Sequence, residues 1–151
     1  MRAPFLGIFW LTAFAATTGL LAAEAKIVKV LPHYVDEQGR HALSPSLYDR
    51  DAYQAFLRRN PQQQSGLRFD VQWKANDSRK PDLKLWAEVR GSLVATPVQI
   101  EMPVNSARRG TRWSALKLEG SDFRALGKPV AWRVSLRDGD QIVTEQKSFL
   151  W

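Results

Sequence analysis

The chain beyond residue 25 alternates between apolar and polar residues, and this alternation constrains the fold more than any other feature of the sequence. The clearest run extends from Leu67 to Lys74, where every second residue is apolar. Because successive side chains of a strand point to opposite faces, a period of two indicates a strand with one buried face. Antiparallel sheets contain such strands, whereas the strands of parallel sheets are apolar throughout. The sequence therefore predicts a fold built mainly from antiparallel β-sheet.

Seven segments alternate in this way or continue the pattern between turn signals, and we predict a strand in each. The predicted strands are residues 26–35, 67–74, 83–90, 98–104, 113–118, 130–137 and 141–149. Pro103 has no N–H to donate to a neighbouring strand, so we expect the fourth strand at a sheet edge. The apolar phase of the strands predicts these inward-facing residues: Phe69, Val71, Trp73, Leu85, Val89, Leu116, Leu118, Trp132 and Val134. Of these, Trp132 is expected to be the most costly to replace by alanine, at about 3 to 5 kcal/mol.

One segment departs from the alternation. Residues 44–49 are rich in helix-capping residues, and the apolar residues after them recur at helical spacing until Asn60 and Pro61. This pattern predicts an α-helix over about residues 47–60. Its apolar stripe needs a surface to cover, and an outward-pointing Trp86 is the partner that we expect.

Seven short strands joined by turn-rich loops predict a β-sandwich. A hydrophobic fraction of 44% with 25% charged residues provides enough apolar surface for a packed core and excludes an intrinsically disordered chain. Residues 26–151 have the length of one domain, and no internal repeat is visible. We therefore predict one sandwich domain with one inserted helix.

The C-terminal part of the chain resembles the last three strands of an immunoglobulin-like or fibronectin type III domain. The resemblance rests on Leu116-x-Leu118, Gly120-Ser121-Asp122-Phe123-x-x-Leu126-Gly127, Val130-x-Trp132-x-Val134-x-Leu136 and the Asp138-Gly139 turn. It implies that Phe123 or Leu126 tucks under the sandwich and that Trp132 helps to lock its corner. The sequence departs from the family in having tryptophan where tyrosine is usual, no cysteine pair and an inserted helix. The expected fold is thus a seven-stranded immunoglobulin-like β-sandwich, a fold that implies no particular activity.

The first 25 residues have the features of an export signal. Arg2 is followed by a stretch without charge over residues 4–21. A retained membrane anchor is the alternative, because about 17 to 25 apolar residues can span a bilayer. Ala23-Glu24-Ala25 favours cleavage, since small residues occupy the two positions that signal peptidase recognises. We expect a signal peptide over residues 1–25 and a periplasmic or secreted domain over residues 26–151, with no membrane span after cleavage.

Few residues suit catalysis or metal binding. The absence of cysteine excludes disulfides, thiolate metal sites and a cysteine nucleophile. His33 and His41 are the only histidines, with Asp36 and Glu37 between them, but their spacing matches no metal-ligand or catalytic signature. We interpret both histidines as surface residues of a loop. No catalytic residue, metal or other cofactor is expected.

A basic cluster is the first candidate binding site. It consists of Arg108, Arg109 and Arg112, in a chain with a formal net charge of +7. Together with Arg58-Arg59 and Arg79-Lys80, these arginines can attract an anionic polymer such as an acidic polysaccharide. The alternative is an ordinary solvated turn, and export makes nucleic acid an unsuitable partner.

Two tryptophans are the second candidate. Trp86 and Trp113 are out of phase with the apolar residues of their strands, so we expect them to point away from the core. Outward tryptophans can anchor a protein partner or stack on a sugar ring. The sequence thus predicts a noncatalytic domain that binds an envelope or extracellular protein or supports an envelope assembly. A glycan-binding or polyanion-binding module is the alternative.

Overall fold

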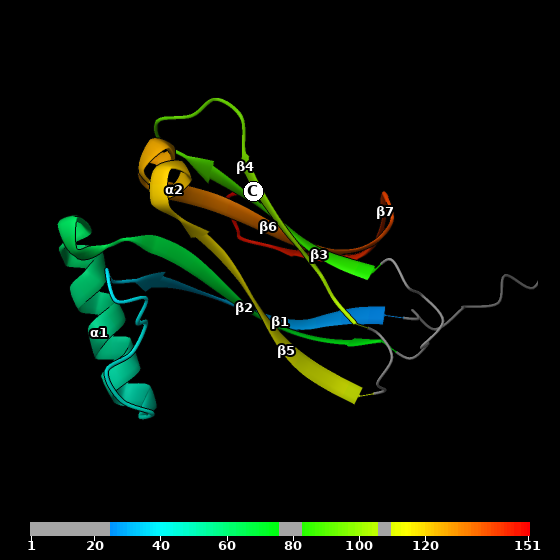
Figure 1. The fold of residues 1–151 in the computed structure, drawn as a ribbon, viewed down its shortest axis with the longest axis horizontal. Helices are drawn as coiled ribbons and strands as arrows, with labels where there is room; N and C mark the ends of the chain where they lie inside the picture. The colour runs from blue at the N-terminus through cyan, green and yellow to red at the C-terminus, as the bar shows by residue number, and fades with distance from the viewer. Residues whose placement is uncertain (1–24, 76–82, 106–109) are drawn as a thin grey trace, which may run out of the picture.

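The computed structural model describes residues 25–75, 83–105 and 110–151, and within these ranges seven strands form two antiparallel sheets. The three-stranded sheet has the order β1-β2-β5 and the four-stranded sheet the order β4-β3-β6-β7. The two sheets pack together as a sandwich (Figure 1). The strands are β1 (Ala25–Val35), β2 (Gly66–Ala75), β3 (Leu83–Gly91), β4 (Val98–Pro103), β5 (Gly110–Glu119), β6 (Pro129–Asp138) and β7 (Gln141–Lys147). The prediction of a mainly β, seven-stranded sandwich is confirmed.

Three helical segments accompany the strands: α1 (Leu47–Arg59), the 3-10 turn η1 (Pro61–Gln63) and α2 (Gly120–Leu126). The predicted helix is confirmed as α1. Ser46 caps its N-terminus, with its Oγ accepting a hydrogen bond from the Asp49 N–H. The short helix α2 was not predicted, because its sequence has the composition of a turn.

No helix in the described ranges is long and apolar enough to cross a membrane. The predicted signal peptide lies outside these ranges except for Ala25, the first residue of β1.

The core lies between the inner faces of the two sheets. All the predicted inward residues are buried except Trp132, which is partly buried and packs against the core. Trp132 meets Phe69 edge to face, with ring centroids 5.9 Å apart. Its other side lines a cavity of about 180 Å³, which explains its partial exposure. Both Phe123 and Leu126 are buried, so α2 closes one end of the core.

The helix α1 does not cover Trp86, and that prediction is wrong. α1 connects β1 to β2, which are neighbours in the three-stranded sheet, and it lies at the end of that sheet (Figure 1). Trp86 lies on β3 in the other sheet. Only part of the α1 stripe is buried: Leu57 is fully buried, whereas Phe56 remains 45% exposed.

The sheet edges differ in how they are protected. β4 is an edge strand, as Pro103 predicted. β1 carries a bulge around Val28 and lies beside β7, where Gln146 Nε2 donates a hydrogen bond to the Val28 carbonyl. β5 pairs with β2 along its 10 residues without a register shift, and it contains no proline. β5 is therefore a long and regular edge.

Candidate functional site

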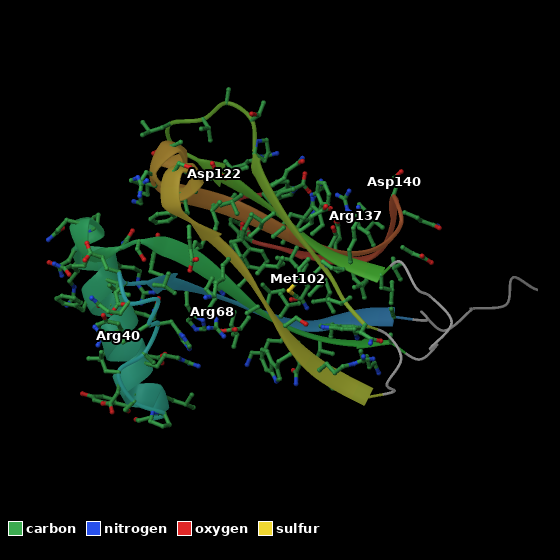
Figure 2. All side chains as sticks on the ribbon, in the orientation of Figure 1. Arg40, Arg68, Met102, Asp122, Arg137 and Asp140 are labelled. Atoms are coloured by element: carbon green, nitrogen blue, oxygen red, sulfur yellow. The ribbon has the colours of Figure 1, made fainter. Side chains whose placement is uncertain are left out.

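An open cleft lies where β4 and β5, the edge strands of the two sheets, approach each other. Its volume is about 470 Å³, and its lining includes Met102, Val104, Arg112 and Trp113. Trp113 is 54% exposed, which confirms that it points away from the core. Met102 extends from β4 toward the space between the sheets (Figure 2). The cleft thus offers apolar surface beside a cationic side chain.

Arg112 connects the two sides of this cleft. Its guanidinium carbon lies 4.5 Å from the ring centroid of buried Trp73, and its Nη1 donates a hydrogen bond to the Asn105 carbonyl just after β4. Trp73 Nε1 in turn donates a hydrogen bond to Ser114 Oγ at 3.0 Å. Stacking and hydrogen bonding restrict the rotamers of Arg112, so its charge is held beside Trp113.

The structure brings together only some of the predicted binding residues. Arg112 and Trp113 line one cleft. Arg108 and Arg109 lie outside the described residues, as do Arg79 and Lys80. Arg58 lines a different cavity, which has no lining residue in common with the cleft at Arg112.

Trp86 occupies a different place, on the outer face of the four-stranded sheet. The guanidinium carbon of Arg137 lies 4.3 Å from its ring centroid and Lys84 Nζ lies 5.1 Å away. Buried Glu88 binds Arg133 Nε and Nη2 at 2.7 and 2.6 Å, and Arg133 also lies 5.0 Å from the ring of Trp151. Side chains of β3 and β6 thus cover Trp86 in place of a helix. The sequence carried a signal for this stack in Glu88, whose charge is opposite to that of Arg133 and Arg137 in the outward phase of β6.

A basic cavity of about 400 Å³ lies between the end of α1 and the end of α2. Arg58, Arg124 and Lys128 line it together with Tyr34 and Phe123, and no acidic residue of the described ranges is in its lining. It adjoins the cavity beside Trp132, with which it shares Tyr34 and Arg58. Burial raises the pKa of Tyr34, so its hydroxyl stays protonated and able to donate a hydrogen bond. Arg58 is the only one of these cations that the sequence had placed in a candidate site.

The histidines are not two surface residues of a loop, and that interpretation is wrong for His33. His33 belongs to β1 and is 7% exposed, because α1 and the loop before it fold over this face of the sheet. The His41 ring, from that loop, lies with its centroid 5.1 Å from that of His33. Asp70 of β2 places Oδ2 at 3.3 Å from His33 Nδ1. Burial and the positive charge of Arg68 lower the pKa of His41, which favours the neutral imidazole.

Asp36, which the sequence had grouped with the histidines, has a structural role. Its buried carboxylate accepts hydrogen bonds from the backbone N–H groups of Gln38 and Arg40, from Arg40 Nε at 2.8 Å and from the Tyr53 hydroxyl at 2.6 Å. Burial alone would raise the pKa of Asp36, but the hydrogen bonds from Tyr53 and Arg40 lower it to about 2. Asp36 therefore fixes the turn before α1. The residue that joins the histidines is Asp70, and no local pattern indicated it.

A second apolar groove runs along α1. Leu43, Ala52, Tyr53 and Phe56 line it, and its volume is about 400 Å³. The rings of Tyr53 and Phe56 are stacked with centroids 5.9 Å apart. The exposed part of the helix stripe thus forms a surface that the alternation of the strands did not reveal.

No protein-family model, curated protein or solved structure matches the chain.

Proposed function

We propose that this chain is a noncatalytic, exported protein-interaction domain that binds an extended segment of an envelope or extracellular protein at the edge of β5. One observation carries the proposal. Trp113 is 54% exposed on an edge strand of 10 residues that has neither a bulge nor a proline. An edge of this kind presents unpaired backbone groups, and natural proteins normally protect such edges unless they are used. Strand addition to a free edge is an established mode of peptide recognition.

The other edges support the choice of β5 by contrast. β1 has its bulge at Val28, its Pro32 and its contacts with β7. β4 has Pro103, and the pairing of β6 with β7 is interrupted between Leu136 and Arg137. Each of these features hinders the addition of a further strand. β5 also contacts β4, but less extensively than β1 contacts β7, and it has neither a bulge nor a proline, so it is the edge that we propose for an added strand.

The cleft beside β5 supports a particular chemistry for the partner. Trp113 and Met102 provide apolar surface, and Arg112 provides a positive charge held by its contacts with Trp73 and Asn105. A bound strand presents alternate side chains to one face. We therefore propose a partner segment with an apolar residue for the cleft and a carboxylate near Arg112.

The strand order supports the immunoglobulin-like assignment. In that family strands A, B and E share one sheet and strands C, F and G the other. The orders β1-β2-β5 and β3-β6-β7 correspond to these two sets, and β4 extends the second sheet as an added C′ strand does in variable-type domains.

Export rests on the signal-like sequence of residues 1–25. Amino-terminal sequencing of the protein from its native host should begin at Lys26, and an intact first residue in the membrane fraction would contradict cleavage.

The binding proposal is tested with a displayed peptide library selected on the full chain. Selected peptides should alternate apolar and polar residues, and bound peptide should protect amides of β5 from hydrogen exchange. Trp113→Ala should weaken peptide binding by tenfold or more, as loss of a central aromatic contact does. Ile142→Ala, at a 42% exposed position on β7, is the matched control and should leave binding unchanged. Protection confined to other strands, or equal binding by the Trp113 variant, would contradict the proposal.

The basic cavity favours a second candidate function, binding of an anionic polysaccharide. Arg58, Arg124 and Lys128 converge on one cavity without an acidic neighbour in its described lining. Binding of an acidic polysaccharide should then fall steeply with salt, because counterions are released and contacts are screened. Replacing these three residues with alanine should abolish this binding. Loss of binding on Arg112→Ala would instead favour the cluster of Arg108, Arg109 and Arg112 that the sequence predicted as the site. Apolar strand addition would depend little on salt.

A further inference from the structure

We propose that His33, His41 and Asp70 form a binding site for a divalent first-row transition-metal ion of the Zn²⁺ or Cu²⁺ type. One ligand atom from each residue lies within 4.8 Å of the other two. His33 comes from β1, His41 from the loop before α1 and Asp70 from β2. The cluster therefore contains both histidines of the sequence. The proposal departs from the sequence-based expectation that the chain holds no metal.

The pair formed by His33 and Asp70 already has the spacing that a metal requires. Ligand atoms at 2.0 to 2.1 Å from a tetrahedral ion lie about 3.4 Å apart. His33 Nδ1 and Asp70 Oδ2 are separated by 3.3 Å. His33 Nδ1 is buried and makes no well-aligned hydrogen bond with any residue of the described ranges. The contact with Asp70 is not aligned as a hydrogen bond, and an ion bound between the two atoms would satisfy this buried nitrogen.

The surroundings of Asp70 orient its carboxylate. Arg68 donates a hydrogen bond from Nε to Oδ1 at 2.9 Å, and its Nη2 lies 2.8 Å from the same oxygen. This contact directs Oδ2 toward His33, in the way that outer contacts orient the ligands of known metal sites. Arg68 also offsets the carboxylate charge. Affinity must then come from the imidazoles, which favour Zn²⁺ and Cu²⁺ over Ca²⁺ and Mg²⁺.

A buried amide of α1 holds the two histidines near each other. Gln54 Nε2 donates hydrogen bonds to the carbonyls of Tyr34 and His41 at 2.8 and 2.9 Å, and Gln54 Oε1 accepts one from the Tyr34 N–H at 2.8 Å. Tyr34 directly follows His33, so a single side chain ties the strand to the loop. The His41 side chain, on a loop, can close the remaining distance when the ion binds. The inserted helix thereby acquires a role in building the site.

Isothermal titration of the metal-free full chain with ZnCl₂, CuCl₂, CaCl₂ and MgCl₂ tests the proposal. We expect one Zn²⁺ or Cu²⁺ per chain with a dissociation constant of about 10 μM or tighter, equivalent to about 7 kcal/mol, and no binding of Ca²⁺ or Mg²⁺. Bound Cu²⁺ should show electron paramagnetic resonance splittings from two imidazole nitrogens. Titration without uptake of Zn²⁺ or Cu²⁺ would overturn the proposal.

Variants separate this site from incidental binding elsewhere. His41→Ala changes a partly exposed loop residue and Asp70→Asn keeps the size of the side chain, so both should fold, which circular dichroism verifies. Each should weaken Zn²⁺ binding by about tenfold or more. Asp51→Asn, at an exposed position of α1, is the control for the carboxylate change and should bind as the wild type does. Wild-type affinity in folded His41→Ala would place the ion at another site and overturn the proposal.

Discussion

Replacing Trp73 with alanine is expected to destabilise the chain more than replacing Trp132. Trp73 is 1% exposed between the two sheets, donates a hydrogen bond to Ser114 and lies under the guanidinium of Arg112. Truncating a buried tryptophan costs about 3 to 5 kcal/mol through lost transfer energy and the cavity left behind. The lost hydrogen bond adds about 1 kcal/mol and the cation–π contact about 0.5 to 1 kcal/mol. We therefore expect about 5 kcal/mol for Trp73→Ala.

The expected cost for Trp132→Ala is smaller, at about 2 to 3 kcal/mol. Trp132 is only partly buried, and a cavity already lies along one side of it. Its edge-to-face contact with Phe69 contributes about 0.5 to 1.5 kcal/mol of this cost. The difference between the two variants should thus be about 2 kcal/mol, in the opposite order to the one that the sequence predicted.

Urea unfolding followed by far-ultraviolet circular dichroism measures both free energies. Tryptophan fluorescence is a poor choice, because the chain contains six tryptophans. If Trp73→Ala fails to fold, Trp73→Phe and Trp132→Phe preserve the ranking with smaller losses. A loss for the Trp132 variant equal to or greater than that for the Trp73 variant would refute the burial argument.

Three further changes test other contacts by urea unfolding. Asp36→Asn removes a carboxylate whose pKa is about 2 against the ordinary 3.8, so up to about 2 kcal/mol of stability is present above pH 4 and disappears as the pH falls toward 2. The difference in free energy of unfolding between the wild type and Asp36→Asn should shrink between pH 7 and pH 3. The control Asp51→Asn should show no such difference from the wild type. Gly91→Ala would bring a Cβ into overlap with the Leu126 carbonyl oxygen and should cost about 2 kcal/mol; a loss under about 0.5 kcal/mol would contradict the contact. Glu88→Ala leaves two arginines of β6 without their shared carboxylate and should lower the free energy of unfolding by about 2 kcal/mol. High salt should not lower the free energy of unfolding of the wild type by as much.

The strands and their inward faces were predictable from the amino-acid sequence alone. Alternation is a local property, because the direction of each side chain in a strand follows from its position in that strand. The buried phase of β2, including Phe69 and Val71, was therefore predictable from that segment alone. Pro103 identified an edge for an equally local reason, its missing N–H. The outward direction of Trp113 was likewise predictable, because this residue is out of phase with the apolar residues of its strand.

The groups that cover the outward-facing residues come from other segments of the fold and were not predictable from the strands themselves. His33 and Glu88 belong to polar phases, yet both are buried, because α1 with its loop covers the first and the arginines of β6 cover the second. The meeting of His33 and Asp70 depends on the register of β1 against β2, and that of His41 on the amide of Gln54. Sequence periodicity reports which way a side chain points from its own strand. Burial and juxtaposition depend on contacts between segments far apart in the chain, which no local pattern encodes.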